Sequence, residues 1–285
     1  MDDRRSAESQ GGVFSMSYRS WFLCPLFAAL AGMACSSDPD PGGGSGGKGT
    51  GGGGHGGSGG AGGPVCTMPT EVPCSDQVIL AMNLKKDPVP AAITNGPDGS
   101  GWTSKIDATA GGAFNPDPTS FTYARFGDGG LEKVEMGDED SLTSMDWDIA
   151  FRRYVVRINS GHSGPSCVTA ARVPPGTAYA DLAAAPDGLN YHHDEYFTED
   201  CTLISDGSGL DNSPATALSS YWTYPGCVKM TGNVFVIELA SGAHVKFVVD
   251  DFYSPTVQET CQTTGMIPMG DSGSGNFVVR WAMLP

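Results

Sequence analysis

The side chains best suited to ligand chemistry lie in one short histidine-containing segment. Residues 191–197 read Tyr-His-His-Asp-Glu-Tyr-Phe and place two adjacent imidazoles among aromatic rings and carboxylates. A neutral imidazole is the commonest metal ligand in proteins, and a nearby carboxylate can fix its tautomer. A solvated surface loop is the alternative, which composition alone favours. The remaining histidines are His55, His162 and His244.

A second pattern, around a serine, lacks the base that a hydrolase needs. Residues Gly270-Asp271-Ser272-Gly273 resemble the nucleophile region of chymotrypsin-like proteases, and residues 168–171 are similar to the segment before their catalytic histidine. The next residue is Arg172, which cannot accept the serine proton. We therefore expect a turn before the last strand, and a protein that is not an enzyme.

Two acidic segments could offer oxygen ligands to calcium. They are residues 137–140, Gly-Asp-Glu-Asp, and residues 206–212, Asp-Gly-Ser-Gly-Leu-Asp-Asn. Neither has the spacing of an EF-hand loop with its terminal bidentate glutamate. We expect both to be solvated turns.

The cysteines indicate an oxidising compartment. Six of the 8 follow residue 65, without a C-x-x-C motif or a histidine at zinc-finger spacing. An even number of cysteines in an exported chain is typical of disulfides, although the sequence leaves the pairing open. Our prediction is one local bond and two longer ones: Cys66–Cys74, Cys167–Cys201 and Cys227–Cys261.

The elements that must position these residues are mostly strands. Residues 121–126 and 131–136 flank Gly127-Asp128-Gly129-Gly130, which predicts a hairpin with a four-residue turn. Over residues 147–158 the apolar alternation changes phase at Arg152 and Arg153. A bulge reverses the faces of a strand, so we expect one there.

A second hairpin and a closing strand follow near the C-terminus. Residues 234–239 and 244–249 flank residues 240–243, and residues 277–283 alternate to the end. The helical candidate is residues 179–185, which Pro186 ends. These patterns predict an all-β fold, a single mainly antiparallel β domain with few short helices.

Residues 1–35 resemble a bacterial lipoprotein signal peptide. Three arginines precede the apolar run 21–34, which is too short to span a membrane. Small residues then lead to Cys35, whose thiol we expect to be acylated. Secretory cleavage near Ala34 is the alternative, and Met16 is an alternative start. The arginines are Arg4, Arg5 and Arg19.

Residues 36–64 predict a disordered Gly-rich linker. They contain no aromatic side chain and almost no aliphatic one, so they cannot bury a core. A glycine-rich chain as long as residues 42–63 spans roughly 26 Å, which suits a leash. The formal net charge of −16 is unsuited to nucleic acid. We expect membrane attachment by the lipid anchor only.

One segment carries a resemblance to a known family. Residues 146–154, Asp-Trp-Asp-Ile-Ala-Phe-Arg-Arg-Tyr, lead into residues 158–164, Ile-Asn-Ser-Gly-His-Ser-Gly. This pattern resembles the signature of the HmuY family of haem-binding lipoproteins, a Trp-Asp-Ile-Ala-Phe strand followed by an Asn-Ser-Gly loop. The resemblance covers roughly residues 106–285, and we expect a HmuY-like β domain over residues 65–285.

The resemblance implies an exported haem carrier. Family members are lipid-anchored or secreted all-β proteins of the outer membrane that take up free haem or haem from a host protein. An outer-membrane receptor is a further implied partner. Haem is held by two axial side chains, which suits storage and transfer. A surface lipoprotein of the same fold that binds a protein, a glycan or another small ligand is the alternative.

The resemblance also implies axial ligands and cations for the haem propionates. By their chemistry His192 or His193 would supply one ligand. The second would come, in falling order, from His162, Met230 or His244. The candidate partners of the propionates are Arg125, Arg152 and Arg153.

Overall fold

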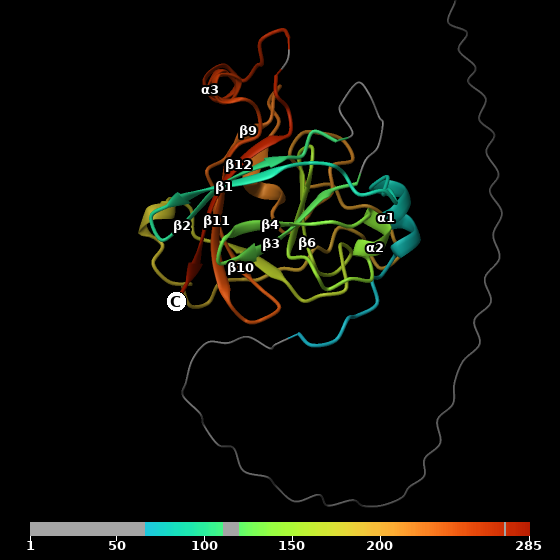
Figure 1. The fold of residues 1–285 in the computed structure, drawn as a ribbon. Coiled ribbons are helices and arrows are strands. Elements are labelled where there is room, and N and C mark those ends of the chain that lie inside the picture. Colours follow the sequence, from blue (N-terminus) through green and yellow to red (C-terminus); the bar gives the residue numbers. More distant parts are fainter. Residues whose placement is uncertain (1–65, 111–119, 271) are drawn as a thin grey trace, which may run out of the picture. The chain divides into compact units, whose positions relative to one another are not determined.

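The computed structural model describes residues 66–110, 120–270 and 272–285. The predicted signal peptide with Met16 and Cys35 and the predicted linker lie outside these residues. The described domain is built mainly from two antiparallel sheets, which we call sheet A and sheet B (Figure 1). This confirms the predicted fold class.

Sheet A has six strands, which come from both ends of the domain. All neighbouring strands in it are antiparallel. In spatial order they are β1 (Ile93–Asp98), β2 (Gly101–Asp107), β12 (Asn276–Leu284), β11 (His244–Asp251), β10 (Val234–Glu238) and β7 (Thr169–Arg172).

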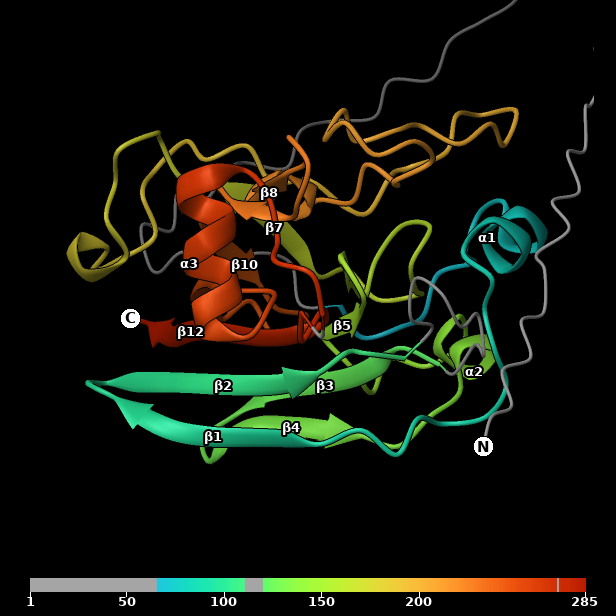
Figure 2. The same ribbon diagram turned by 90° about the horizontal axis from the view of Figure 1, so that it is seen from above.

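Sheet B has four strands from the middle of the domain. In spatial order they are β4 (Gly130–Val134), β3 (Thr122–Gly127), β5 (Ile149–Arg152) and β6 (Val155–Ile158). A short ribbon pairs β8 (Trp222–Thr223) with β9 (Lys229–Met230). In Figure 2, β1 and β2 run beside β4 and β3.

The main core lies between the two sheets. Strand side chains alternate between faces, so every second residue of each sheet enters this core. Phe126 of β3 packs edge-on against Trp281 of β12, with ring centroids 4.9 Å apart. Phe151 of β5 lies 5.3 Å from Phe277 of β12. These aromatic contacts hold the sheets face to face.

The strands of the second predicted hairpin and the closing strand are present as β10, β11 and β12. The first hairpin is also present, but its turn is shorter than predicted. Gly127 pairs with Gly130, so Asp128 and Gly129 form a two-residue turn. Gly130 has φ +118°, and a Cβ there would lie 2.4 Å from the Asn95 side chain, so both conformation and space require glycine.

The predicted bulge is wrong. Residues 147–158 form two antiparallel strands, β5 and β6, in which Arg152 pairs with Val155. Arg153 and Tyr154 make the connecting turn, and Arg153 has φ 52°. A turn and a bulge both reverse the phase of an apolar alternation, which is why the pattern misled us.

Helices are short and differ from the predicted one. The chain forms α1 (Ser75–Ala81), α2 (Asp138–Ser141) and α3 (Pro255–Thr264). The predicted helix at residues 179–185 is only a 3-10 turn, η1 (Tyr179–Asp181), and a second turn is η2 (Ser219–Tyr221). None of the helices in the described ranges has the length and apolar character needed to cross a bilayer.

The disulfide pairing was only partly predicted. Cys227 bonds Cys261 as expected. Cys74 bonds Cys201, so the predictions of Cys66–Cys74 and Cys167–Cys201 are wrong. Cys74 bonds a distant cysteine because α1 begins directly after it, which directs this thiol toward the 198–201 turn.

The carboxyl of Asp148 should make stability depend on pH. Burial raises its pKa to about 6, although the Phe126 amide donates to it at 3.0 Å. The folded pKa exceeds the unfolded one, so the resulting stabilisation is complete below about pH 4 and lost as the pH rises through about 6. Relative to Asp148→Asn, the wild-type free energy of unfolding should fall by roughly 2–3 kcal/mol between pH 4 and pH 7. Urea unfolding of both proteins at both pH values measures this change. The same difference in free energy of unfolding between wild type and Asp148→Asn at pH 4 and pH 7 would contradict the prediction.

Candidate functional site

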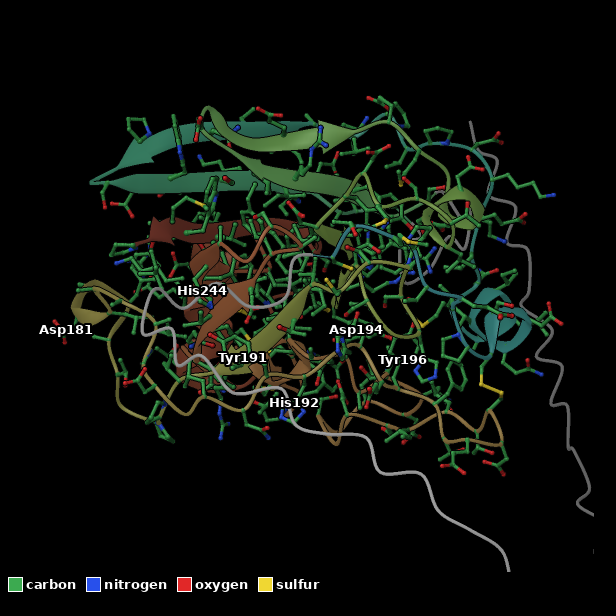
Figure 3. The ribbon with its side chains drawn as sticks, turned by 90° about the horizontal axis from the view of Figure 1, so that it is seen from below. Asp181, Tyr191, His192, Asp194, Tyr196 and His244 are labelled. Carbon is green, nitrogen blue, oxygen red and sulfur yellow. A yellow bond between two sulfur atoms is a disulfide. The ribbon has the colours of Figure 1, made fainter. Side chains whose placement is uncertain are left out.

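The histidine-containing segment, residues 190–197, runs along the free edge of sheet A beside β7 (Figure 3). His192 and Ala170 exchange two backbone hydrogen bonds, of 2.9 and 3.0 Å. The side-chain amide of Asn190 lies 2.8 Å from Nε2 of His192. His192 therefore extends sheet A by one paired residue at the free edge of β7.

Asp194 anchors the other end of the segment in the protein interior. Its carboxylate accepts hydrogen bonds from the Ile158 amide at 2.9 Å, the Ser163 hydroxyl at 2.6 Å and the Ala217 amide at 2.8 Å. Burial raises the pKa of Asp194 to about 6, against the effect of these donors and of Arg157. The two exposed histidines thus lie on backbone that is fixed on both sides.

His192 and His193 are the exposed candidates. Neighbouring residues of an extended segment point to opposite faces, so the two imidazoles cannot approach one ligand from the same side. The ring centroid of Tyr191 lies 6.0 Å from that of His244. This contact brings the segment and β11 together on the outer face of sheet A.

His244 begins β11 and is partly covered. Its Nε2 lies 3.6 Å from a carboxylate oxygen of Glu238, the residue opposite it in β10. Burial and the Glu238 charge raise the pKa of Tyr191. The outer face of sheet A therefore combines imidazole, phenol and carboxylate groups at one place.

His162 and Met230 lie apart from this face. His162 is 6% exposed, its ring packs against Tyr196 and Phe197 with centroids 5.4 Å away, and burial lowers its pKa. The Phe197 amide donates to its Nδ1 at 3.4 Å. Met230 is also 6% exposed and belongs to the core between the sheets. Both side chains are therefore covered by protein in this structure.

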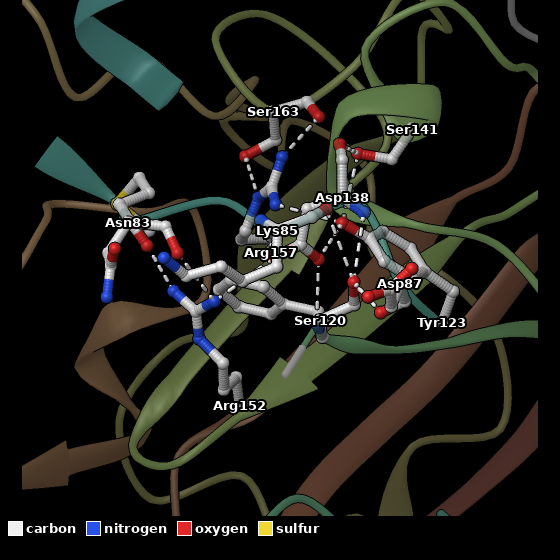
Figure 4. Close-up of polar contacts among 12 residues, drawn as sticks. Asn83, Lys85, Asp87, Ser120, Tyr123, Asp138, Ser141, Arg152, Arg157 and Ser163 are labelled. Atoms are coloured by element: carbon white, nitrogen blue, oxygen red, sulfur yellow. Dashed lines mark hydrogen bonds and ion pairs between the residues drawn. The ribbon is translucent and has the colours of Figure 1, made fainter. Parts of the chain in front are cut away.

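The three arginine candidates have different surroundings, and Figure 4 shows those of Arg152. Arg152 donates to the buried Asp138 carboxylate at 3.2 Å, and its guanidinium lies 4.1 Å from the Phe121 ring centroid. Arg153 donates to the Ser274 carbonyl at 3.2 Å. Arg125 is exposed on β3, opposite Glu132. Of the three, Arg125 is the one placed to meet a ligand from solvent.

The acidic segment 137–140 is not a solvated turn. Asp138 is fully buried in α2 and accepts from the Phe121 amide at 2.6 Å, the Tyr123 hydroxyl at 2.9 Å and the Lys85 amide at 3.0 Å. Its carboxylate therefore organises the outer side of sheet B and is not available to calcium. Three consecutive acidic residues are typical of an exposed turn, so the sequence did not indicate that Asp138 is buried.

In the loop at residues 206–212, the carboxylate of Asp206 is occupied by hydrogen bonds from nearby residues. Asp206 accepts from the Ser208 amide at 2.9 Å and the Ser213 hydroxyl at 2.7 Å. Across the described ranges no three His, Cys, Asp or Glu side chains gather as a metal site would require. A depression of about 350 Å³ lies between residues 173–177 and 231–234, and its lining contains neither histidine nor methionine.

The prediction from sequence missed two exposed thioether groups. Met266 and Met269 follow α3 and are 66% and 104% exposed, and Ile267 between them is 40% exposed. A methionine on a loop tip is unusual because the side chain is apolar. The signal available in the sequence was the motif Gly-Met-Ile-Pro-Met-Gly, where two glycines and a proline predict an exposed turn.

Comparison with known proteins points to one family. The model of the HmuY protein family matches residues 117–265, just over half of the chain. No curated protein matches the sequence.

Solved structures with a similar course of the chain have low sequence identity. A candidate HmuY-like haem-binding protein of Bacteroides vulgatus is 17% identical, with a TM-score of 0.40, over 70% of this chain and 96% of its own. A candidate lipoprotein of Bacteroides fragilis is 13% identical, with a TM-score of 0.37, over 66% and 91%. The apo form of a HmuY analog of Tannerella forsythia is 14% identical, with a TM-score of 0.36, over 70% and 99%. The family match, which covers both predicted signature segments, is the finding that decides: the chain belongs to the HmuY family.

Proposed function

We propose that this protein is an exported, lipid-anchored surface protein that binds haem for uptake or sequestration. The observation that supports this most is the contact of Tyr191 with His244 on the outer face of sheet A, since alternation along the segment would place His193 on the same side as Tyr191. Family membership supplies the expectation of haem, and the fixed histidine segment supplies a suitable place for it.

The residues present fit an iron porphyrin in their donor chemistry. Haem supplies an iron with two open axial positions, which imidazole nitrogens bind well. His193 is exposed on backbone that Ala170 and Asp194 hold in place, so little ordering is needed on binding. His244 is the second axial candidate because His162 and Met230 are buried.

The anionic propionates need cations, since the chain has a formal net charge of −16. Arg125 is exposed, but it alternates with the inward-facing Phe126 and therefore lies on the outer side of sheet B, away from the outer face of sheet A. Arg152 is bound to Asp138, and moving it toward a ligand would leave a buried carboxylate without its cation. Arg153 would have to leave its bond to Ser274.

Hemin titration of the purified full-length chain tests this proposal. The wild type should shift and sharpen the Soret band, and His193→Ala should reduce hemin affinity at least tenfold. His192→Ala is the matched control, because this neighbouring imidazole points to the opposite face and should be dispensable. A wild-type spectrum identical to free hemin would overturn the proposal.

The titration also tests the choice of ligands. Loss of the shift in His192→Ala with retention in His193→Ala would exchange their assigned roles. A shift retained in the double variant His192→Ala/His193→Ala would refute axial ligation by this segment and direct attention to Met266 and Met269, the exposed thioether groups.

A second candidate function is binding of a protein or glycan by the same fold. The exposed apolar tip formed by Met266, Ile267 and Met269 favours it. Exposed apolar groups of this kind are common where proteins meet partners. Partner binding that is lost in Met266→Ser/Met269→Ser but retained in His192→Ala/His193→Ala would support this candidate over haem binding.

A further inference from the structure

Cys66 and Cys167 are the two cysteines of the described residues that form no disulfide. Both are partly exposed. They lie about a hundred positions apart in the sequence, with several helices and strands between them. Their spacing in the sequence therefore could not predict that the two cysteines are neighbours.

The sheet register brings these two cysteines to the same place. In the β7–β10 pair, Thr169 lies opposite Glu238. Continuing this antiparallel register by two residues sets Cys167 beside Ala240. The Ala240 carbonyl accepts a hydrogen bond of 3.0 Å from the Cys66 amide. Cys66 and Cys167 are thus both neighbours of Ala240.

The backbone around Cys167 is held in place. Cys167 forms an isolated antiparallel bridge with Ser160, and the Val168 amide donates to the Asn159 carbonyl at 3.2 Å. Asn159 is itself buried and donates to the Trp147 carbonyl at 2.8 Å. The position of Cys167 near Cys66 is therefore fixed by the packing of the folded domain.

The side chains themselves also meet. Burial raises the pKa of the Cys167 thiol to about 12, and a hydrogen bond with Cys66 and the Glu238 charge add to the effect. A thiol held in its protonated form is a poor nucleophile and a poor metal ligand. The surroundings favour a structural use of this pair.

We propose that Cys66 and Cys167 form a third disulfide, which clamps the beginning of the described domain to the segment before β7. Each thiol gives up one proton and one electron, and one sulfur–sulfur bond forms. The oxidant is a protein disulfide of a thiol oxidase, which is reduced to two thiols through a mixed disulfide. The proposal requires an oxidising compartment, and in the cell it therefore depends on the predicted export.

The clamp would have a mechanical consequence. Cys66–Cys167 and Cys74–Cys201 would bracket residues 67–73, which include the exposed Glu71. A single cut in this bracket would leave the preceding chain covalently bound to the domain. The segment that we expect to carry the lipid anchor would stay attached after such a cut.

Peptide mapping of the full-length chain tests the bond directly. The protein is equilibrated in a glutathione redox buffer, free thiols are alkylated, and the digest is analysed without reduction. We expect one cross-linked peptide pair containing Cys66 and Cys167, lighter by two hydrogens than the separate peptides. Alkylation of both thiols after oxidation, or pairing of Cys66 with Cys24 or Cys35, would overturn the proposal.

Two variants make the mapping specific. Cys66→Ser should leave Cys167 as a free thiol that is alkylated once the protein is denatured, and should leave the Cys74–Cys201 pair intact. Cys35→Ser is the matched control and should leave the clamp in place. Because this readout contains no haem, a failed hemin titration would not affect it.

Limited cleavage at Glu71 gives an independent readout. With the clamp, the cut chain should migrate as one band without reductant and as two bands with it. Cys66→Ser should release the N-terminal fragment without reductant. Release of this fragment from the oxidised wild type would contradict the clamp.

Discussion

Replacement of Asp194 by alanine should destabilise the domain by about 3–5 kcal/mol. The carboxylate accepts three hydrogen bonds in the interior, from Ile158, Ser163 and Ala217. Alanine would leave these donors without partners and weaken the charge balance of Arg157, which is fully buried. Denaturant unfolding at pH 7.5 measures the loss.

The same substitution should also affect the ligand site. The Asp194 carboxylate holds the histidine segment, so the variant should bind hemin more weakly than its remaining folded fraction accounts for. Asp200→Ala is the matched control, because this carboxyl is exposed on the turn that follows the segment. An Asp194→Ala variant with wild-type stability would show that the buried network is not needed for folding.

Removal of the Cys74–Cys201 bond should produce the second large effect. This disulfide closes a sequence separation of 127 residues, and chain entropy predicts a cost of about 5 kcal/mol for Cys74→Ser/Cys201→Ser. The bond joins α1 to the turn after the histidine segment. We expect a lower unfolding midpoint, measured by thermal denaturation under non-reducing conditions.

The second disulfide gives a built-in comparison. Cys227–Cys261 closes only 34 residues, for which the same relation gives about 4 kcal/mol. Cys227→Ser/Cys261→Ser should therefore cost less than the first pair. A reversed order would contradict the entropic account and indicate that packing around α3 dominates, since Cys261 is fully buried.

The strands that could be predicted are those whose side chains enter one core. In β11, Val245 and Phe247 alternate with the polar His244 and Lys246, and both apolar side chains lie between the sheets. Such alternation follows directly from burial of one face of a strand. The same logic located β3, β4 and β12.

The elements that escaped prediction depend on contacts between distant residues. α3 contains few apolar side chains, and its helix is held partly by Gln258, whose side chain bonds Phe252 and Val228. Asp138 belongs to an acidic run in the sequence, but its carboxylate is buried and binds four groups that are distant in sequence, those of Lys85, Phe121, Tyr123 and Arg152 (Figure 4). Neither arrangement leaves a local periodic signal.

The sequence could predict which kinds of ligating side chain the candidate site offers, but not which of them lie close together. The pattern around residues 191–197 pointed to two imidazoles that are exposed in the structure, because aromatic and charged neighbours are typical of an edge segment. Burial of His162 and Met230 depends on packing against Phe197 and within the main core. The sequence could not order the candidates for a second ligand for that reason.

Electron paramagnetic resonance of the ferric hemin complex tests the central proposal most directly. Two imidazole ligands from the protein should give a low-spin signal in the wild type and in His192→Ala, and this signal should convert to high spin in His193→Ala and in His244→Ala. A wild-type complex that stays high-spin, or a low-spin signal unchanged in both His193→Ala and His244→Ala, would contradict haem ligation on the outer face of sheet A.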